Sequence, residues 1–519
     1  MTLRCAAVFA ALSFFLMVGR LAAQDVTLTS SDGAVEISGT LLGFDGEFYR
    51  VETKFGELTV DGSGVNCEGP GCPNLAAYVA EVTFSGSSAM AEVLVPALIE
   101  GFALRNGYRT QRQKEEGDNF RYDLLDGQSG GTLARFYFYV SNTDEGFADL
   151  LANETDVVMA LREIRPQERQ LAKEAGMGDM TDTNRSLVLA LDAMVPVVAP
   201  GNPVRTISTL DLARVFAGEV TNWTDLGGPD APIALHLPDP GFGLAQAVED
   251  RLIKVAGREF TPDIARHTLS SDLARAVVTD PFAIGIASYA ESGAARALTL
   301  TGACGFTLAA TRRTIKTEDY PLNSPMFLYL PARRLPKIAR AFLAYTRGPS
   351  AQIVIRRSGF VDQVPEEVPL GLQGDRLSNA IQAAGEEVDL DTLRAMIDVL
   401  RPMQRLSLSF RFETGSSRLD AQSRSNVAQF TRELESGVFD GRRMVFVGFS
   451  DGEGAAAGNL RISEARAKAV RDAVLDNAEA ADLTEEDIEI AAFGEAMPMA
   501  CDDTDWGRQV NRRVEVWLQ

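Results

Sequence analysis

Two oppositely charged residues near the C-terminus have the types and spacing needed to bind a zwitterion. Asp451 follows the apolar segment 444–447, and Arg466 lies in a segment, 459–474, whose pattern predicts a helix. At 3.6 residues per turn, the apolar residues around Arg466 form one predicted inward-facing stripe: Ile462, Ala465, Ala469, Ala473 and Val474. Because an unpaired buried charge costs several kcal/mol, Arg466 must be paired or must reach a ligand. Asp451 and Arg466 are therefore expected either to form an internal ion pair or to grip a ligand that carries both ammonium and carboxylate.

Four short motifs surround this pair in a fixed order. They are Gly-Phe-Ser-Asp at 448–451, Asn-Leu-Arg-Ile-Ser-Glu-Ala-Arg at 459–466, Gly-Glu at 494–495 with Pro498, and Asn-Arg-Arg-Val-Glu at 511–515. Together, over residues 403–519, they resemble the OmpA-like peptidoglycan-binding domain. The resemblance implies that Asp451 takes the ammonium and Arg466 the carboxylate of diaminopimelate in the peptidoglycan stem peptide. It places Ser450, Asn459 and Arg512 in supporting positions of the peptidoglycan-binding site, and Phe449 stands where many members have His or Tyr.

A second set of motifs lies in the middle of the chain. Residues 207–228 read Ile-Ser-Thr-Leu-Asp-Leu-Ala-Arg-Val-Phe-Ala-Gly-Glu-Val-Thr-Asn-Trp-Thr-Asp-Leu-Gly-Gly, with supporting matches at 195–198, 202–204 and 280–287. This set resembles the phosphate-type periplasmic solute-binding proteins and covers residues 75–365. The resemblance implies two α/β lobes joined by a hinge, with the ligand in the cleft between them.

The residues that would hold an anion in that cleft are only partly present. Ser87 and Ser88 follow a predicted strand at 82–84 and begin a helix, where free N–H groups and the helix dipole favour an anion. Arg162 is a candidate third group for this tentative solute site; the alternatives are an ordinary serine N-cap and a solvated arginine. The family binds the anion with a second-lobe Ser-Gly-Thr, whereas residues 237–243 read Leu-Pro-Asp-Pro-Gly-Phe-Gly. Since each lost charge-assisted bond is worth about 1.5–3 kcal/mol, tight phosphate binding is not expected.

Composition and charge restrict the class of protein. The chain has 519 residues, too many for one core, and a formal net charge of −22. So acidic a surface argues against nucleic acid and anionic membranes as partners. Residues 1–23 have the basic, apolar and small-residue parts of a cleaved signal peptide, which predicts export. Together with the resemblance to a peptidoglycan-binding domain, export implies a Gram-negative periplasm.

The predicted compartment matters for the cysteines, because disulfides form and persist in the periplasm. In an oxidising environment, the Cys67–Cys72 loop predicts a disulfide. Cys304 and Cys501 would have to pair across domains or stay free, and the sequence leaves both alternatives open. The two histidines, His236 and His267, show no metal-ligand spacing, so neither a metal nor a cofactor is expected.

The remaining segments complete the predicted organisation. Residues 24–74 are expected to form a small β module, with strands at 35–42, 48–53 and 57–60, and residues 366–402 a polar linker with a helix at 386–400. In 403–519 we expect strands at 406–412, 443–449, 487–493 and 513–518 and helices at 420–435 and 459–475, packed with one face of the sheet covered. The predicted fold class is multidomain α/β: the β module, a two-lobed periplasmic-binding-protein fold and an OmpA-like α/β sandwich.

The sequence therefore predicts a periplasmic phosphate-type solute-binding protein anchored non-covalently to peptidoglycan, with a small anion such as phosphate as a second ligand. No nucleophile–base pairing and no Gly-x-Ser-x-Gly motif indicate an enzyme. The alternative is an envelope structural or sensing protein whose solute-binding domain has lost phosphate binding and docks an envelope protein partner.

Overall fold

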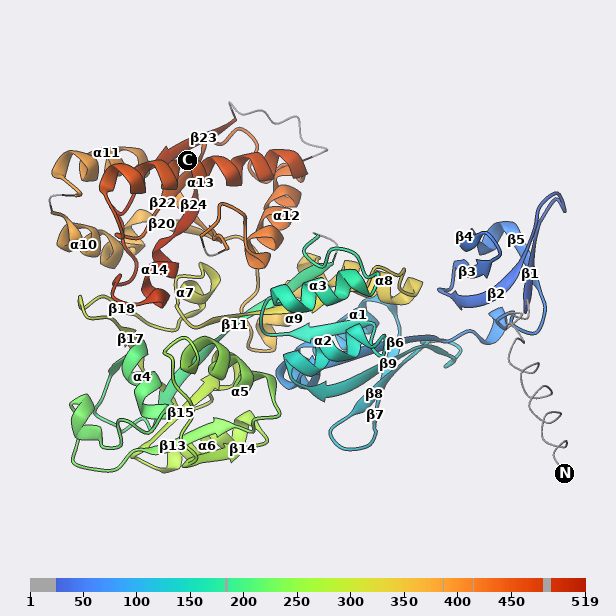
Figure 1. The fold of residues 1–519 in the computed structure, drawn as a ribbon, viewed down its shortest axis with the longest axis horizontal. Helices are drawn as coiled ribbons and strands as arrows, with labels where there is room; N and C mark the ends of the chain where they lie inside the picture. The colour runs from blue at the N-terminus through green and yellow to red at the C-terminus, as the bar shows by residue number, and fades with distance from the viewer. Residues whose placement is uncertain (1–24, 183–184, 386, 414, 479–486) are drawn as a thin grey trace, which may run out of the picture.

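The computed structural model describes residues 25–182, 185–385, 387–413, 415–478 and 487–519. The predicted signal peptide lies outside these residues. Figure 1 shows a small β module at one end, two α/β lobes in the middle and a C-terminal domain that sits against the lobes on the opposite side. Within the described ranges, no helix combines the length and apolar character that crossing a bilayer requires.

The N-terminal module is a five-stranded antiparallel sheet in the order β4-β3-β2-β1-β5. Its small core contains Val26, Leu28, Tyr49 and Val51. Cys67 and Cys72 are bonded, with their Cα atoms 5.8 Å apart, which confirms the predicted disulfide. The strands are β1 (Val26–Ser30), β2 (Glu36–Phe44), β3 (Phe48–Thr53), β4 (Gly56–Asp61) and β5 (Val65–Glu68).

This module docks on the first lobe through charges at the β2–β3 turn. Glu47 lies 3.0 Å from Lys337 and 3.1 Å from Arg334, and it also accepts a bond from Arg340. Arg334 donates to Asp45 at 2.6 Å. Arg340, Lys337 and Arg334 together hold the pKa of Glu47 well below its usual range, at about 2, the Arg340 bond being the largest cause.

The two lobes share one mixed sheet in the order β14-β13-β15-β11-β19-β10-β6-β9-β8-β7, with β16 paired to β11. The long strand β11 (Ser186–Val198) and its antiparallel partner β19 (Asn323–Tyr329) pass from one lobe into the other and so form the hinge. Lobe 1 contributes β6 (Ala80–Ser87), β7 (Arg109–Lys114), β8 (Phe120–Leu125), β9 (Thr132–Ser141) and β10 (Val157–Ala160). Lobe 2 contributes β13 (Ala234–Pro238), β14 (Ile264–His267), β15 (Ala283–Ser288) and β16 (Arg296–Ala297), and a separate small sheet of β12 (Thr206–Ser208), β17 (Thr299–Thr301) and β18 (Thr307–Leu308).

Helices pack on this sheet in both lobes (Figure 1). Their buried apolar faces join one continuous core that extends through both lobes. Lobe 1 carries α1 (Val95–Asn106), α2 (Thr143–Leu151), α3 (Pro166–Glu174), α8 (Lys337–Thr346) and α9 (Pro349–Arg357). Lobe 2 carries α4 (Thr209–Phe216), α5 (Gly243–Val248) and α6 (Ser270–Thr279), and α7 (Arg312–Lys316) lies beside the C-terminal domain.

The C-terminal domain has a five-stranded sheet in the order β20-β21-β24-β22-β23. Its strands are β20 (Glu367–Pro369), β21 (Gln404–Phe410), β22 (Met444–Phe449), β23 (Ile488–Ala492) and β24 (Arg513–Leu518). Its helices are α10 (Gly374–Ala383), α11 (Leu390–Leu400), α12 (Ala421–Glu435), α13 (Ala456–Asn477) and α14 (Asp505–Asn511).

Two predictions about this domain are wrong. The segment 366–402 is not a linker: β20 pairs with β21, and α10 and α11 pack their buried residues on the sheet. Both faces of the sheet are therefore covered, since α12 and α13 pack on the other face. The physical reason lies in β22, which is buried at all six positions and needs apolar cover on both sides.

A buried charge network fastens this domain to the hinge. Arg405 on β21 is 2% exposed and donates to both carboxylate oxygens of Asp319, at 2.7 and 3.1 Å. Glu318, next to it, has a left-handed φ of 58°, and its carbonyl accepts a bond from Arg411 at 2.6 Å. Although burial opposes ionisation, Arg405 holds the pKa of Asp319 below its ordinary value. Removing one partner by substitution would leave an uncompensated buried charge at the contact between the domains.

The network continues into the C-terminal sheet. Glu515 on β24 is fully buried and accepts bonds from Arg513 at 2.7 Å, from Trp517 at 3.0 Å and from Arg376. Burial opposes ionisation of Glu515 as well, but its arginine neighbours keep its pKa below the usual range. Arg513 and Glu515, which belong to the motif at 511–515, are therefore part of the domain core.

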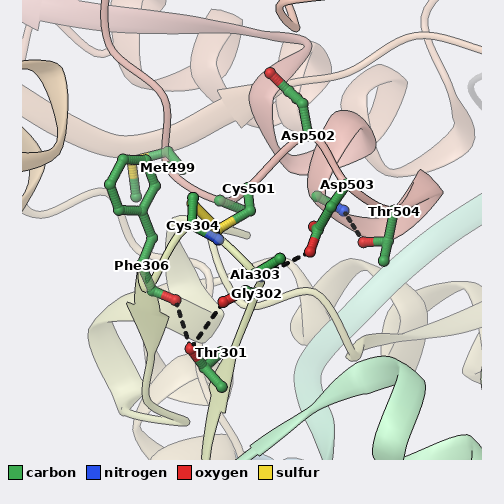
Figure 2. The surroundings of a disulfide bond; sticks show 12 residues. Thr301, Gly302, Ala303, Cys304, Phe306, Met499, Cys501, Asp502, Asp503 and Thr504 are labelled. Carbon is green, nitrogen blue, oxygen red and sulfur yellow. Dashed lines mark hydrogen bonds between the residues drawn. A yellow bond between two sulfur atoms is a disulfide. The ribbon is translucent and has the colours of Figure 1, made fainter. Parts of the chain in front are cut away.

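A disulfide adds a covalent link at the same interface. Cys304, in the loop between β17 and β18, is bonded to Cys501 of the C-terminal domain, 197 residues away (Figure 2). Beside it, the backbone N–H of Ala303 donates to Asp503 at 2.7 Å. The pairing that the sequence left open is thus an interdomain bond.

We expect Glu47→Gln to loosen the N-terminal module from lobe 1, because the substitution removes the charge that three basic side chains share. Limited proteolysis with mass spectrometry should show faster cleavage in segment 70–80. Since the folded pKa of Glu47 is depressed, its contribution is present above about pH 4.5 and is lost as the pH falls towards 2. Glu57→Gln, which breaks the Arg50–Glu57 pair inside the module, is the matched control and should leave this cleavage unchanged.

Asp319→Asn should lower the free energy of unfolding by about 3 kcal/mol, because it leaves Arg405 buried without its carboxylate. Urea unfolding followed by tryptophan fluorescence would measure this, since Trp517 lies in the same network. The control, Asp391→Asn, removes an exposed pair with Arg394 and should change stability by less than about 0.5 kcal/mol. Equal effects of the two substitutions would contradict the importance of the buried pair.

Candidate functional site

The first candidate site lies at the C-terminal end of β22. Asp451 follows this strand, and Arg512 connects α14 to β24, which pairs with β22. Arg512 Nη1 donates to Asp451 Oδ2 at 2.6 Å, and the two side chains are 27% and 12% exposed. The internal ion pair of this site is therefore Asp451–Arg512, whereas the sequence suggested Asp451–Arg466 as one alternative.

Arg466 lies beside that pair with its charge uncompensated. Its guanidinium carbon is 5.3 Å from the centroid of the Phe412 ring. Burial and the neighbouring Arg512 lower the pKa of Arg466, and Asp451 opposes this effect. In the part of the chain that the structure describes, Arg466 has no carboxylate at ion-pair distance. A partly buried arginine with a weak cation–π contact and no anion is suited to receive a carboxylate from outside.

The predicted apolar stripe of α13 is correct at its end, where Val474 is buried and Ala473 packs against the core, and wrong at its start. Ile462 is 48% exposed and Ala465 is also exposed, while the buried face carries Asn459, Ser463, Ala467, Val470, Arg471 and Val474. The reason is a close approach of helix and strand: a Cβ added to Gly448 would lie 2.0 Å from the Ser463 carbonyl oxygen. Small polar side chains fit this contact and find partners there, since Ser463 Oγ donates to the Leu460 carbonyl at 2.8 Å.

Asn459 and Ser450 occupy the floor of the site. Asn459 is 3% exposed, and its amide donates to Glu495. Ser450 is equally buried; its N–H donates to the Gly494 carbonyl at 2.8 Å, and its Oγ has no hydrogen-bond partner among the described residues. Burial, together with Glu387, Asp502 and Asp451, raises the pKa of Glu495. This acidic surrounding favours a cationic group near Asp451.

A cavity of about 550 Å³ opens next to this floor. Glu495 and Asp502 line it together with Val388 from the α10–α11 connection and Phe306 from lobe 2. The loop that carries the interdomain disulfide therefore lines this cavity, next to the candidate peptidoglycan-binding site.

Asn511 is a structural residue whose role the sequence motif alone did not define. Its side-chain oxygen accepts the N–H groups of Met499 and Ala500, at 2.7 and 3.0 Å. Its amide nitrogen donates to the Ala500 carbonyl and to Asp502, both at 2.8 Å. All hydrogen-bonding positions of Asn511 are used, so it fixes the loop that precedes Arg512.

The second candidate site, in the interlobe cleft, is filled by protein. Ser87 ends β6, is fully buried, and its Oγ has no hydrogen-bond partner among the described residues. Gly243, the first residue of α5 in lobe 2, packs against it: a Cβ at Gly243 would lie 3.1 Å from Ser87 Oγ. The lobes also meet where the Thr143 N–H donates to Gln246 at 3.0 Å. The loop before α5 thus closes directly over Ser87, while Ser88 lies one residue further, partly buried.

Arg162 is engaged by carboxylates. It donates to Glu168 at 2.7 and 2.8 Å and to Asp144, and it lies over the Phe147 ring with 5.2 Å between guanidinium carbon and centroid. No contact in the described structure joins Arg162 to Ser87 or Ser88. Among these residues, then, no cation is free to neutralise an anion beside the two serines.

The histidines bond each other: His236 Nδ1 and His267 Nε2 are 2.9 Å apart on adjacent strands. Among the described residues, no group of three or more His, Cys, Asp or Glu side chains is arranged to hold a metal ion.

Two lobes of α/β structure with crossing hinge strands define the architecture of a periplasmic binding protein, here joined to a separate mixed α/β domain. The PBP superfamily domain matches residues 73–349, and the OmpA family matches residues 411–512. The chain belongs to the PBP superfamily and carries an OmpA-family domain at its C-terminus.

Relatives are similar over the lobes. Protein SphX of Synechococcus elongatus is 24% identical over 218 residues, which cover 40% of this chain and 63% of that protein. The phosphate-binding protein PstS of Borreliella burgdorferi is 22% identical over 200 residues, covering 37% of this chain and 70% of that protein. This chain therefore matches less than two thirds of the length of SphX.

Solved structures are similar to each part. A phosphate transport receptor from Vibrio cholerae shares 19% identity at a TM-score of 0.41, covering 54% of this chain and 99% of the receptor. The peptidoglycan-associated lipoprotein from Burkholderia pseudomallei shares 24% identity at a TM-score of 0.19, covering 21% of this chain and 89% of that protein.

Proposed function

We propose that this chain is a periplasmic protein anchored non-covalently to peptidoglycan, with its two lobes serving as a solute-binding domain of the phosphate type. The observation that supports wall anchoring is Arg466, a partly buried arginine with no carboxylate partner in the described structure, beside the Asp451–Arg512 pair. In this proposal the diaminopimelate carboxylate binds Arg466 and its ammonium shares Asp451 with Arg512. Ser450 supplies a further hydrogen-bonding group, and Asn459 positions Glu495.

A second candidate function concerns the lobes alone. Gly243 packs against Ser87, and residues 237–243 lack the hydroxyl donors of phosphate binders, which favours a solute-binding domain that has lost phosphate. In that case the lobes would dock an envelope protein, and the wall-binding domain would hold the assembly in place.

Asp451→Ala and Arg466→Ala should each weaken binding of the purified protein to peptidoglycan sacculi by about ten- to a hundredfold, because each removes a charge-assisted contact of about 1.5–3 kcal/mol. Co-sedimentation with sacculi measures this. Arg461→Ala, an exposed arginine on the same helix, is the matched control and should bind as the wild type does. Wild-type binding by both site variants would refute diaminopimelate recognition here.

A thermal-shift titration with inorganic phosphate separates the two functions of the lobes. The second candidate, in which Gly243 packs against Ser87 in place of an anion, predicts no saturable rise in melting temperature. A ligand at 100 times its Kd would add about 2.7 kcal/mol, so binding would be visible. A saturable shift that disappears in Ser87→Ala would instead support phosphate binding and exclude the second candidate.

A further inference from the structure

A cavity of about 290 Å³ lies where both lobes and the C-terminal domain meet. Arg162 of lobe 1, Arg251 of lobe 2 and Gln422 of the C-terminal domain are among the residues that line it, whereas Ser87 and Gly243 are not. Since one water occupies about 30 Å³ of liquid, the space holds about ten waters or one small organic molecule. Of the candidate residues described above it shares only Arg162 with the tentative solute site; Ser88, Asp451 and Arg466 do not line it either.

Arg251 brings an unpaired positive charge to this cavity. Its guanidinium donates to the Asn323 backbone carbonyl, and its own carbonyl accepts a bond from Trp506 Nε1 at 2.8 Å. In the described ranges no carboxylate lies at ion-pair distance from it. Burial lowers the pKa of Arg251 to about 10, which reflects how poorly its charge is compensated. A ligand carboxylate would provide the missing partner.

Two buried amides bring unused acceptors to the same cavity. Asn323 and Gln422 are 6% and 5% exposed, and within the described structure neither Asn323 Oδ1 nor Gln422 Oε1 has a hydrogen-bond partner. The orientation of Gln422 is fixed by its neighbour: Asn426 donates to the Ser409 carbonyl at 2.8 Å, so its oxygen must accept from Gln422 Nε2, at 3.0 Å. Gln422 Oε1 therefore needs a donor, because a buried acceptor left unpaired costs about 1–3 kcal/mol.

The acidic residues of the cavity distinguish a zwitterion from a simple anion. Four of the acidic residues that line it have an arginine partner. Glu163 pairs with Arg424 at 3.0 Å and Asp250 with Arg165 at 2.5 Å. Asp505 pairs with Arg508, and Glu318 lies 3.9 Å from Arg411. Asp420 has no such cation among the described residues; one of its oxygens caps α12 by accepting the Ser423 N–H at 2.8 Å. A free anion on Arg251 would be repelled by Asp420, whereas an attached ammonium would be attracted to it.

We propose that this cavity binds a free α-amino acid, with its carboxylate on Arg251 and its ammonium on Gln422 Oε1 and Asp420. Because Arg251 belongs to lobe 2 and Gln422 and Asp420 belong to the C-terminal domain, a bound amino acid bridges these two parts and stabilises their docked arrangement. This site is independent of the phosphate-type cleft and of the wall-binding site.

The test is a thermal-shift titration of the full-length protein with each of the twenty free L-amino acids. Acetate, methylammonium and inorganic phosphate serve as probes that carry only one of the two charges. We expect a saturable shift with at least one amino acid and a clearly weaker response to the single-charge probes. Arg466→Ala should keep the amino-acid response, which separates this cavity from the wall-binding site.

Two variants test the assigned contacts. Gln422→Met keeps the side-chain volume and removes the acceptor, and Arg251→Gln removes the charge. Each substitution should weaken amino-acid binding by tenfold or more. Arg258→Gln, which breaks a contact with Glu219 away from the cavity, is the matched control. No saturable shift with any amino acid, unchanged affinity in Gln422→Met, or an equal response to acetate or phosphate would each overturn the proposal. If Arg251→Gln does not fold, Gln422→Met alone still decides the outcome.

Discussion

The structure depends on the buried contact between Arg405 and Asp319, which joins the C-terminal sheet to the segment leading into the hinge strand β19. Glu515 extends this contact to Arg376 and Arg513, so charges from the lobes, from α10 and from β24 share one enclosed network. In the docked protein these charges are buried, so removing one partner by substitution would leave the other charge uncompensated, at a cost of several kcal/mol. The interdomain disulfide constrains the same interface covalently.

This attachment determines how the lobes can move. The C-terminal domain contacts lobe 1 through Arg424 and Glu163, at 3.0 Å, and lobe 2 through Trp506 and the Arg251 carbonyl. Opening the cleft about β11 and β19 would have to break contacts on at least one side. Any force on the C-terminal domain is therefore transmitted to the two lobes, and any change in the angle between the lobes acts on the docked domain.

The motif residues of the C-terminal domain divide into residues at the candidate site and residues that build its support. Asp451, Arg466 and Arg512 place two guanidinium groups and one carboxylate at the edge of the sheet, leaving Arg466 uncompensated in the described structure. Asn511 fixes the preceding loop with four hydrogen bonds, and Arg513 and Glu515 lie within the core. A motif that looks uniform in sequence thus has two physical roles: Arg512, which connects α14 to β24, reaches Asp451, whereas β24 itself is buried at every position.

Local patterns in the sequence determined the elements: the strands and main helices of the C-terminal domain, the Cys67–Cys72 bond, and the two resemblances that define the fold. They did not determine which faces would be buried. The alternation of Arg405, Ser407, Ser409 and Arg411 with apolar residues is typical of a half-exposed strand, yet all four polar residues are buried, with Arg405, Ser409 and Arg411 bonded to residues 317–319. Likewise, the inner face of α13 carries the polar Asn459 and Ser463 in place of Ile462. Cys304 forms a disulfide with Cys501, 197 residues away in the sequence. Each outcome depends on partners distant in sequence, since a polar group can be buried wherever tertiary contacts satisfy its charge or hydrogen bonds, and no local periodicity records those contacts.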